Sequence, residues 1–344
     1  MGLFLAVDGG QTTTKVVVAD ERGRILGFAS GGPSNHTEEP GGPERLERVI
    51  RSATNGALQA AGAAPVADQE FEAACFGMTG ETAIKRRVLE QLIKTPRLAV
   101  VHDSVNALMG ATAGKPGLIV IAGTGSVARG MDGRGREIRI GGWGHLFGDE
   151  GSAYAISRHA IRSIAAELDG FGQSTQMTSM FLSRLSVDSA YDLMAKYYSG
   201  EWSRDHLAGL APWVSESALA GDLVAQRILT DAGRDLAGFA VTLLPLLFGG
   251  PASSASTAGP IISYVGGVFE DRLVLTAFKE AIRTASDAAR IEPPLLPPVL
   301  GSLLLAYQRA DVQCPESVYR SWPKALGVAK TRGSDEARPS SESS

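Results

Sequence analysis

Two segments of this chain repeat one pattern of strands and turns, and this repetition constrains the fold more than any other feature. Residues 3–29 contain an apolar strand, a turn rich in Gly and Thr, a second strand, a turn of Gly and Arg, and a third strand. Residues 117–140 follow the same order, with a Gly and hydroxyl turn at 123–126. Such β-branched runs between Gly-rich turns are typical of antiparallel strands. Repetition on this scale indicates duplicated architecture, so we predict two similar α/β lobes facing each other across a cleft.

Strands alternate with helices in the rest of the first lobe. Apolar residues at helical spacing predict helices over 44–62, 84–94 and 104–114, and apolar runs predict strands over 70–78 and 97–103. The resulting order, βββ-α-β-α-β-α, predicts a mixed sheet.

The second lobe carries a long helical insertion. We expect a helix from 149–152 to about 168, with the acids of that segment in its first turn, where the helix dipole favours them. Residues 170–199 and 205–247 are also mostly helical by periodicity. The elements expected after them are a strand over 261–265, a helix over 273–289, a rigid connector over 293–298 and a last helix over 299–310.

These elements set the expected domain organisation. The first lobe would span residues 1–115 and the second 116–298, and the final helix, 299–312, would pack back on the first lobe. Residues 330–344 hold almost no apolar side chain, so we expect a disordered tail.

Composition excludes several classes of function. The chain has 344 residues, 44% of them hydrophobic, and a net charge of −4, which gives no indication of nucleic acid or an anionic membrane as partner. The two cysteines, Cys75 and Cys314, exclude a disulfide scaffold, a Cys-based zinc site and a self-contained Fe–S site. The first strand begins at residue 3, leaving no room for a signal peptide, and Pro245 interrupts a long apolar stretch. We expect a cytoplasmic protein.

The first hairpin carries groups suited to phosphate. Its tip offers uncrowded backbone N–H groups, hydroxyls, an ammonium and one acid that could hold a hydrated cation. The residues are Asp8, Gly9, Gly10, Thr12, Thr13 and Lys15. They predict a grip on nucleotide phosphates with Mg²⁺, and an ordinary hairpin with a polar tip is the alternative.

The second Gly-rich turn is not a dinucleotide-binding loop. Residues 123–128 match the G-x-G-x-x-[GA] pattern formally, but that pattern requires a helix to follow, and a strand follows here. The sequence also lacks a Walker A motif and any His or Cys pair at zinc spacing.

Two further features could carry chemistry. Asp103 lies between a strand and a helix, where it could take a proton from a sugar hydroxyl during phosphoryl transfer or simply cap the helix. The segment 141–154 has a glycine density that indicates close approach of backbone to a ligand, with Asp149 available to accept hydroxyl hydrogen bonds. A Gly-rich hinge is the alternative for this segment.

Several of these motifs resemble those of one superfamily. The loops at 8–15 and 123–126 and the turn at 266–267 resemble the two phosphate motifs and the adenosine motif of the sugar kinase/Hsp70/actin ATPases, with ribonuclease H-like lobes. Residues 34–36 and 102–103, and above all 142–145 with 148–154, resemble N-acetylglucosamine kinases. That group belongs with the BadF/BadG/BcrA/BcrD ATPases, and the resemblance runs from residue 3 to about 310.

The resemblance implies a role for each site residue. Asp103 would be the catalytic base, and Asp8 would position Mg²⁺ through water. The sugar would contact Asn35, Asp103, Gly142, Trp143, Gly144 and Asp149, with Ser126 and Val127 beside it. The ATP site would comprise Gly9, Gly10, Thr12, Thr13, Lys15, Thr124 and Gly125 at the phosphates and Gly266 and Gly267 at the adenosine. Two departures, Val127 in place of a polar residue and Gln11 in place of Gly, leave the amino-sugar substituent open.

The leading hypothesis is an ATP- and Mg²⁺-dependent kinase acting on the 6-hydroxyl of N-acetylglucosamine or a relative. Glucosamine and N-acetylmuramic acid are alternative substrates, and the resemblance suggests a homodimer. A second hypothesis is an ATPase that activates a radical dehydratase or reductase, but the resemblance calls for an Fe–S cluster between subunits, and Cys75 and Cys314 do not match that pattern. A sugar-sensing regulator is a third, which would carry a helix-turn-helix absent from this sequence.

Overall fold

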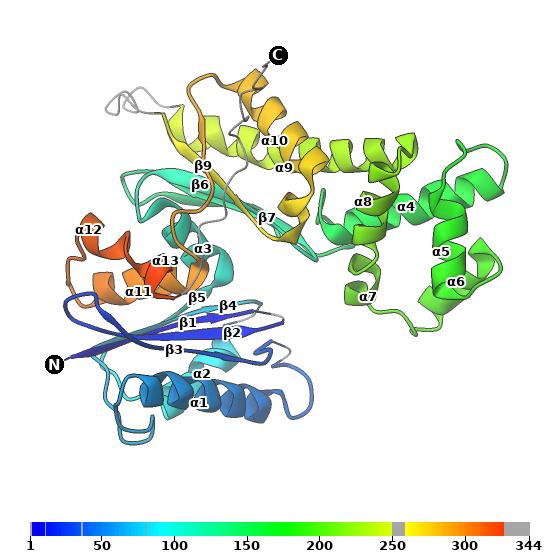
Figure 1. Ribbon diagram of the computed structural model, residues 1–344. Helices are drawn as coiled ribbons and strands as arrows, with labels where there is room; N and C mark the ends of the chain where they lie inside the picture. The colour runs from blue at the N-terminus through cyan, green and yellow to red at the C-terminus, as the bar shows by residue number, and fades with distance from the viewer. Residues whose placement is uncertain (1, 11, 36, 81, 250–258, 327–344) are drawn as a thin grey trace, which may run out of the picture. The chain divides into compact units, whose positions relative to one another are not determined.

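The computed structural model describes residues 2–10, 12–35, 37–80, 82–249 and 259–326 (Figure 1). The predictions made for Gln11, for position 36 and for the tail at 330–344 lie outside these residues. The chain forms two compact units, one of residues 1–102 with 295–344 and one of residues 103–294. We expected the first lobe to continue to residue 115, whereas the first unit ends at His102.

The first unit is built on a five-stranded mixed sheet of order β3-β2-β1-β4-β5. β1 is antiparallel to β2 and parallel to β4, and β4 is parallel to β5. The strands are β1 (Leu3–Gly9), β2 (Thr14–Asp20), β3 (Ile25–Gly31), β4 (Ala73–Met78) and β5 (Leu98–His102). The helices are α1 (Gly42–Ala60), α2 (Ala83–Leu92), α11 (Pro298–Arg309), α12 (Glu316–Tyr319) and α13 (Trp322–Ala325).

Helices cover both faces of this sheet, α1 and α2 on one and α11 on the other (Figure 1). The sheet therefore has buried apolar residues along β1 and β2. Three side chains of the C-terminal segment donate to strand and turn carbonyls: Ser302 Oγ to Val7 (2.8 Å), Tyr307 OH to Asp20 (2.6 Å) and Trp322 Nε1 to Gly23 (2.6 Å). The end of the described chain thus stabilises the sheet that the beginning forms.

The second unit contains a second five-stranded sheet with the same topology. Its order, β8-β7-β6-β9-β10, repeats the first sheet strand for strand, including which neighbours are parallel. The strands are β6 (Gly117–Ala122), β7 (Ser126–Met131), β8 (Glu137–Gly141), β9 (Ile261–Val265) and β10 (Arg290–Ile291). This repetition confirms the predicted α/β fold of two actin-like lobes.

The helical insertion extends the core of the second unit. Its hydrophobic core runs without interruption from Leu118 and Val120 in β6 to Leu236 and Ala240 in the insertion. The helices are α3 (Asp103–Thr112), α4 (Ala153–Leu168), α5 (Met177–Leu185), α6 (Ala190–Tyr198), α7 (Arg204–Ala208), α8 (Ala211–Leu219), α9 (Leu223–Phe248) and α10 (Arg272–Ala285), with a 3₁₀ turn η2 (Gly267–Glu270). None of the described helices combines the length and hydropathy needed to cross a membrane.

Two local expectations need correction. The acids at 149 and 150 do not enter the first turn of α4, because Ser152 is its N-cap and accepts from the Ala155 N–H. The helix expected to reach residue 289 ends at Ala285, since β10 forms the next edge of the sheet. The stretches 170–199 and 205–247, expected to be mostly helical, contain the helices α5 to α9.

Candidate active site

The tip of the first hairpin is closed by its own backbone. Gly10 N–H donates to the Thr13 carbonyl at 3.0 Å, which leaves Thr12, Thr13 and Lys15 exposed. Thr14, by contrast, is buried and donates its hydroxyl to the Gly32 carbonyl at 2.8 Å. The hydroxyls open to a ligand are therefore those of Thr12 and Thr13.

Gly9 is a glycine for a packing reason. A Cβ at this position would lie 2.5 Å from Ser34 Oγ and 2.6 Å from Met78 Sδ. The loop after β3, which carries the buried Asn35, therefore lies directly against the hairpin, and Ser34 N–H also donates to the Gly10 carbonyl (3.4 Å). The structure brings Asn35 close to the first phosphate loop.

The two acids predicted in or next to this lobe lie at the carboxyl ends of two strands that run in the same direction. Asp8 is a half-buried residue near the end of β1, and Asp103 directly follows β5 as the first residue of α3. Carboxyl ends of parallel strands in an α/β sheet are where ligand-facing groups gather. The residue after Asp103, Ser104, is fully buried and accepts from Arg129 Nε of β7 at 2.9 Å. The start of α3 is thereby fixed to the second sheet.

In the second unit, Ser126 connects the two Gly-rich segments. Its N–H donates to Asp149 Oδ1 (3.1 Å), its hydroxyl donates to the Glu150 carbonyl (2.7 Å), and its carbonyl accepts from Gly142 N–H (3.0 Å). Ser126 is 3% exposed, so these bonds are shielded from water. All the polar groups of Ser126 thus hold the 141–152 segment to the 123–126 loop.

The N-terminus of α4 adds to this connection. Ala153 N–H donates to the Gly123 carbonyl at 2.9 Å, and Tyr154 N–H donates to the Thr124 carbonyl at 3.4 Å. The first orphan donors of α4 are therefore satisfied by the loop. The expected sugar-binding segment and the expected phosphate loop form a single hydrogen-bonded assembly.

Asp149 is buried and ion-paired. Its φ is +66°, in the left-handed region that Asp tolerates better than most residues. One carboxylate oxygen accepts from Ser126, and the other lies 2.8 Å from Nη2 of Arg204. The Asp149 side chain is 3% exposed and the Arg204 side chain 29% exposed.

Sequence reasoning missed Arg204, because it lies 55 residues away in the short helix α7 and belongs to no motif. Its guanidinium lies next to Gly125 in the loop at 123–126. A Cβ on Gly125 would lie 2.4 Å from Arg204 Nη2 and 2.7 Å from Asp149 Oδ1. A side chain at the second glycine of the loop would therefore displace the Arg204–Asp149 ion pair.

The segment around Trp143 presents backbone and one large ring. Gly142 and Gly144 have φ of +71° and +80°, which favours glycine at both positions. A Cβ on Gly142 would touch Val127 at 3.2 Å, so Val127 lies beside this backbone. Trp143 is 70% exposed, with the Arg139 guanidinium 5.9 Å from the centroid of its ring. Backbone and indole are thus both open to a ligand.

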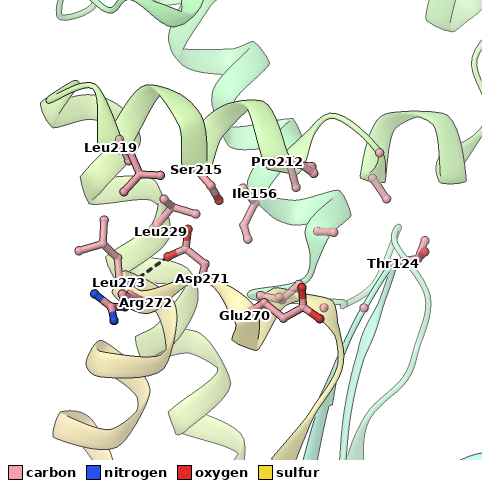
Figure 2. Close-up of a pocket in the computed structure, with 18 of the residues that line it drawn as sticks. Thr124, Ile156, Pro212, Ser215, Leu219, Leu229, Glu270, Asp271, Arg272 and Leu273 are labelled. Atoms are coloured by element: carbon pink, nitrogen blue, oxygen red, sulfur yellow. Dashed lines mark hydrogen bonds between the residues drawn. The ribbon is translucent and has the colours of Figure 1, made fainter. Parts of the chain in front are cut away.

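A cavity of about 1010 Å³ opens beside the phosphate loop (Figure 2). Thr124 lies at one side, and another side is lined by Glu270, the last residue of η2, and by Asp271 and Leu273 at the start of α10. The rest of its lining is largely apolar and includes Ile156, Pro212, Ser215, Leu219 and Leu229 from the insertion. These insertion residues could not be identified from the sequence, because they look like ordinary helix positions.

Gly266 and Gly267 lie where the cavity meets β9. Gly267 lines the cavity, and Gly266 has a φ of +114°. A Cβ on Gly266 would lie 2.1 Å from the Ala122 carbonyl oxygen at the end of β6. The expected adenosine turn is therefore fixed against the strand that leads into the phosphate loop.

The described residues contain no group of three or more His, Cys, Asp or Glu that could hold a metal ion. Mg²⁺ in phosphoryl-transfer enzymes is typically held by one or two carboxylates together with substrate phosphates and water. The single carboxylate of Asp8, near the hairpin tip expected to bind phosphate, fits that mode. The residues present therefore fit Mg²⁺ that arrives with a nucleotide.

The duplicated sheets and their paired loops define the two-lobed ATPase class that includes the actin-like sugar kinases. The chain belongs to the BadF/BadG/BcrA/BcrD ATPase family, whose model matches residues 5–306. This confirms the resemblance found in the sequence.

The chain is similar to named kinases in sequence and in structure. The chain is 31% identical over 241 residues to the N-acetylmuramic acid/N-acetylglucosamine kinase of Clostridium acetobutylicum, covering 69% of this chain and 77% of that protein. It is 27% identical over 319 residues to the N-acetyl-D-glucosamine kinase of Dictyostelium discoideum, covering 88% and 97%. The crystal structure of a protein assigned as an N-acetylglucosamine kinase from Chromobacterium violaceum matches with a TM-score of 0.72 and 25% identity, covering 89% and 99%. The chain is therefore an ATP-dependent kinase.

Proposed function

We propose that this protein transfers the γ-phosphoryl group of ATP to the 6-hydroxyl of N-acetylglucosamine or a close relative. The observation that carries the proposal is the bonding of the 141–152 segment to the phosphate loop through Ser126 and the start of α4. The carboxylate and the open glycine backbone, which suit a polyhydroxylated ligand, thus lie next to the Gly-rich turn at 123–126, which we assign to phosphate. The named relatives act on sugars of this class.

We assign the nucleotide to the cavity of the second unit. Its apolar lining suits an adenine ring, Gly266 and Gly267 would flank the adenosine, and Thr124 and Gly125 would face the phosphates. The first hairpin would add hydrogen bonds to phosphate from Gly9, Gly10, Thr12 and Thr13 and a positive charge from Lys15. Mg²⁺ bound near Asp8 would offset phosphate charge.

We assign the acceptor sugar to the polar residues around the two loops. Asn35 and Asp149 would bind hydroxyls, and Gly142 and Gly144 would offer backbone groups. Trp143 would cover an apolar face of the ring, and Ser126 and Val127 would lie beside the substituent at carbon 2. The open indole supports this role for Trp143. Exposure of its apolar ring to water is unfavourable, and an apolar sugar face bound against the ring would remove that surface from water.

Asp103 would act as the general base. As the 6-hydroxyl oxygen attacks the γ-phosphorus, its proton passes to the Asp103 carboxylate, the bond from the γ-phosphorus to the bridging oxygen breaks, and ADP leaves with that electron pair. Asp103 is in the first turn of α3, directly after β5, at the end of the strand where ligand-facing groups gather in an α/β sheet. The same position would suit a capping role, so the variant below decides between the two.

Glucosamine and N-acetylmuramic acid are alternative acceptors. We also propose a homodimer, from the resemblance alone, to be checked by light scattering.

The alternative proposal from another class of function is an ATPase that activates a radical enzyme. Burial raises the pKa of the Cys75 thiol to about 12 and that of the Cys314 thiol to about 11, and the two cysteines do not match the pattern that the resemblance calls for. A purified protein with Fe–S absorbance would favour the activator instead.

A coupled ADP-release assay across N-acetylglucosamine, glucosamine, N-acetylmuramic acid and glucose tests the function. Mass spectrometry and phosphorus NMR of the product then identify the phosphorylated position. Asp103→Asn should abolish turnover while calorimetry still detects sugar binding, and Asp188→Asn, at an exposed site before α6, is the matched control. Full activity of Asp103→Asn would refute the base assignment, and no sugar-dependent ADP release would refute the kinase.

A further inference from the structure

We propose that Arg204 is a positioning residue for the acceptor sugar, which it serves by holding the carboxylate of Asp149 in a fixed orientation beside the loop at 123–126. The inference rests on the proposed function, because it takes Asp149 as a sugar-binding group. It adds a residue from the helical insertion that no motif identifies.

The environment of Asp149 requires a counter-charge. Its side chain is 3% exposed, and a buried carboxylate is costly unless it is paired and hydrogen-bonded. Ser126 N–H supplies one hydrogen bond at 3.1 Å, and Arg204 Nη2 supplies both a hydrogen bond and the positive charge at 2.8 Å. Without Arg204, the orientation of the Asp149 carboxylate would depend on one N–H group, that of Ser126.

Arg204 in turn depends on Asp149. Among the residues the structure describes, the Arg204 guanidinium donates a hydrogen bond to Asp149, and Arg204 Nε is buried without an acceptor. The two side chains therefore fix each other. A perturbation of either one should reach the sugar through the same carboxylate.

The backbone of α7 places Arg204 firmly. Ser203 caps the helix by accepting from His206 N–H (3.1 Å). Trp202 and Leu207, on either side of Arg204, are buried in the core of the second unit, and the Trp202 ring stacks on His206 with centroids 5.1 Å apart. The guanidinium is thus held from the insertion core rather than from a free loop.

Contact of the guanidinium with Gly125 offers a different role, in which Arg204 binds the transferred phosphoryl group. The two roles differ in which kinetic constant changes. Loss of a sugar-positioning group raises KM for the sugar, whereas loss of a phosphoryl-binding cation lowers kcat or raises KM for ATP. The ion pair with Asp149 favours the first.

The test compares Arg204→Gln, Arg204→Lys, Asp149→Asn and the double variant Asp149→Asn/Arg204→Gln. We expect Arg204→Gln to raise KM for the acceptor sugar roughly 10- to 100-fold, with KM for ATP within about twofold of the unmodified enzyme. Arg204→Lys should recover part of the loss, because it keeps the charge. The double variant should be no worse than Asp149→Asn, because both changes act on one group.

Arg184→Gln is the matched control. Arg184 also lies in the insertion and pairs with an acid, Glu216, at 2.7 Å, but both side chains are exposed. It should leave the kinetic constants unchanged. Thermal unfolding of every variant separates loss of fold from loss of positioning, and the milder Arg204→Lys keeps the test available if Arg204→Gln does not fold.

The outcomes separate two failures. A normal sugar KM in Arg204→Gln alongside an impaired Asp149→Asn overturns the inference and leaves the proposed function standing. A change confined to kcat or to KM for ATP overturns it in favour of a phosphoryl contact. A normal sugar KM in Asp149→Asn overturns the assignment of Asp149 in the proposed function itself.

Discussion

The backbone N–H of Ser126 donates to Oδ1 of Asp149 over 3.1 Å, although the two residues are 23 positions apart in the sequence. Ser126 begins β7, and Asp149 lies just before the N-cap of α4. The bond therefore connects the loop expected to bind phosphate with the carboxylate expected to bind sugar. A displacement of one is transmitted to the other through a buried bond.

Ser126→Ala tests this connection. It removes the 2.7 Å bond from the hydroxyl to the Glu150 carbonyl and keeps the N–H bond to Asp149. We expect the free energy of unfolding to fall by about 1 kcal/mol, and KM for the sugar to rise more than KM for ATP. Urea unfolding and initial rates measure both. The control is Ser163→Ala, which removes an exposed hydroxyl that donates to the His159 carbonyl at 3.0 Å. If the two variants behave alike, Ser126 does not organise the site.

Asp222 should make the insertion sensitive to acid. Burial opposes its ionisation, but hydrogen bonds from Thr175 Oγ1 (2.6 Å), Ala225 N–H (2.9 Å) and Gln176 N–H (2.5 Å) outweigh burial and lower its pKa below 3.8. A carboxyl group whose pKa is lowered by folding stabilises the folded state at pH values above its ordinary, unfolded-state pKa. That stabilisation is lost as the pH falls through the pKa of the folded state. Asp222 is also the N-cap of α9, so its carboxylate stabilises both the turn at 175–176 and the start of α9.

We therefore expect Asp222→Asn to lower the free energy of unfolding at pH 7 by about 1 to 2 kcal/mol. The difference from the unmodified protein should persist to about pH 5 and shrink below the ordinary Asp pKa of 3.8. Urea unfolding at several pH values measures it, with the exposed Asp188→Asn as control. A difference that grows on acidification would contradict the assigned sign.

The duplicated sheet could be predicted from sequence because its signals are local. Strand, Gly-rich turn and strand follow one another within 3–29 and within 117–140, so periodicity and turn residues suffice. The candidate loops were identified for the same reason. The α/β order then leaves few topologies, and the structure shows the same one twice.

The contacts that organise the candidate site could not be predicted in this way. Arg204 meets Asp149 only because packing of the insertion brings α7 to the phosphate loop, and no local pattern records that approach. The acids at 149 and 150 look like first-turn residues of α4, but the left-handed backbone at Asp149 turns the chain before the helix begins. Tertiary packing decided both cases.

Gly266→Ala should be strongly destabilising. The new Cβ would lie 2.1 Å from the Ala122 carbonyl oxygen, and the backbone φ of +114° is rarely adopted by residues with a side chain. Because the obstacle is backbone, we expect a loss of about 3 kcal/mol or more in the free energy of unfolding, with weaker binding of a non-hydrolysable ATP analogue. In the neighbouring Gly267→Ala, a Cβ meets nothing within 4 Å, so its stability should remain near that of the unmodified protein. Equal losses in the two variants would show that the close approach at β6 is not the cause.

Gly125→Ala should affect function more than stability. Its Cβ would lie 2.4 Å from Arg204 Nη2 and 2.7 Å from Asp149 Oδ1, and these are side-chain ends that can move rather than backbone. We expect a moderate cost of about 1 to 3 kcal/mol in the free energy of unfolding. Because the methyl group displaces the ion pair, KM for the sugar should rise about as much as in Arg204→Gln. Urea unfolding and steady-state rates measure the two effects, and Gly123→Ala is the control for stability, since a Cβ there meets nothing within 4 Å. If Gly125→Ala leaves the sugar KM unchanged, the ion pair above the phosphate loop does not position the sugar.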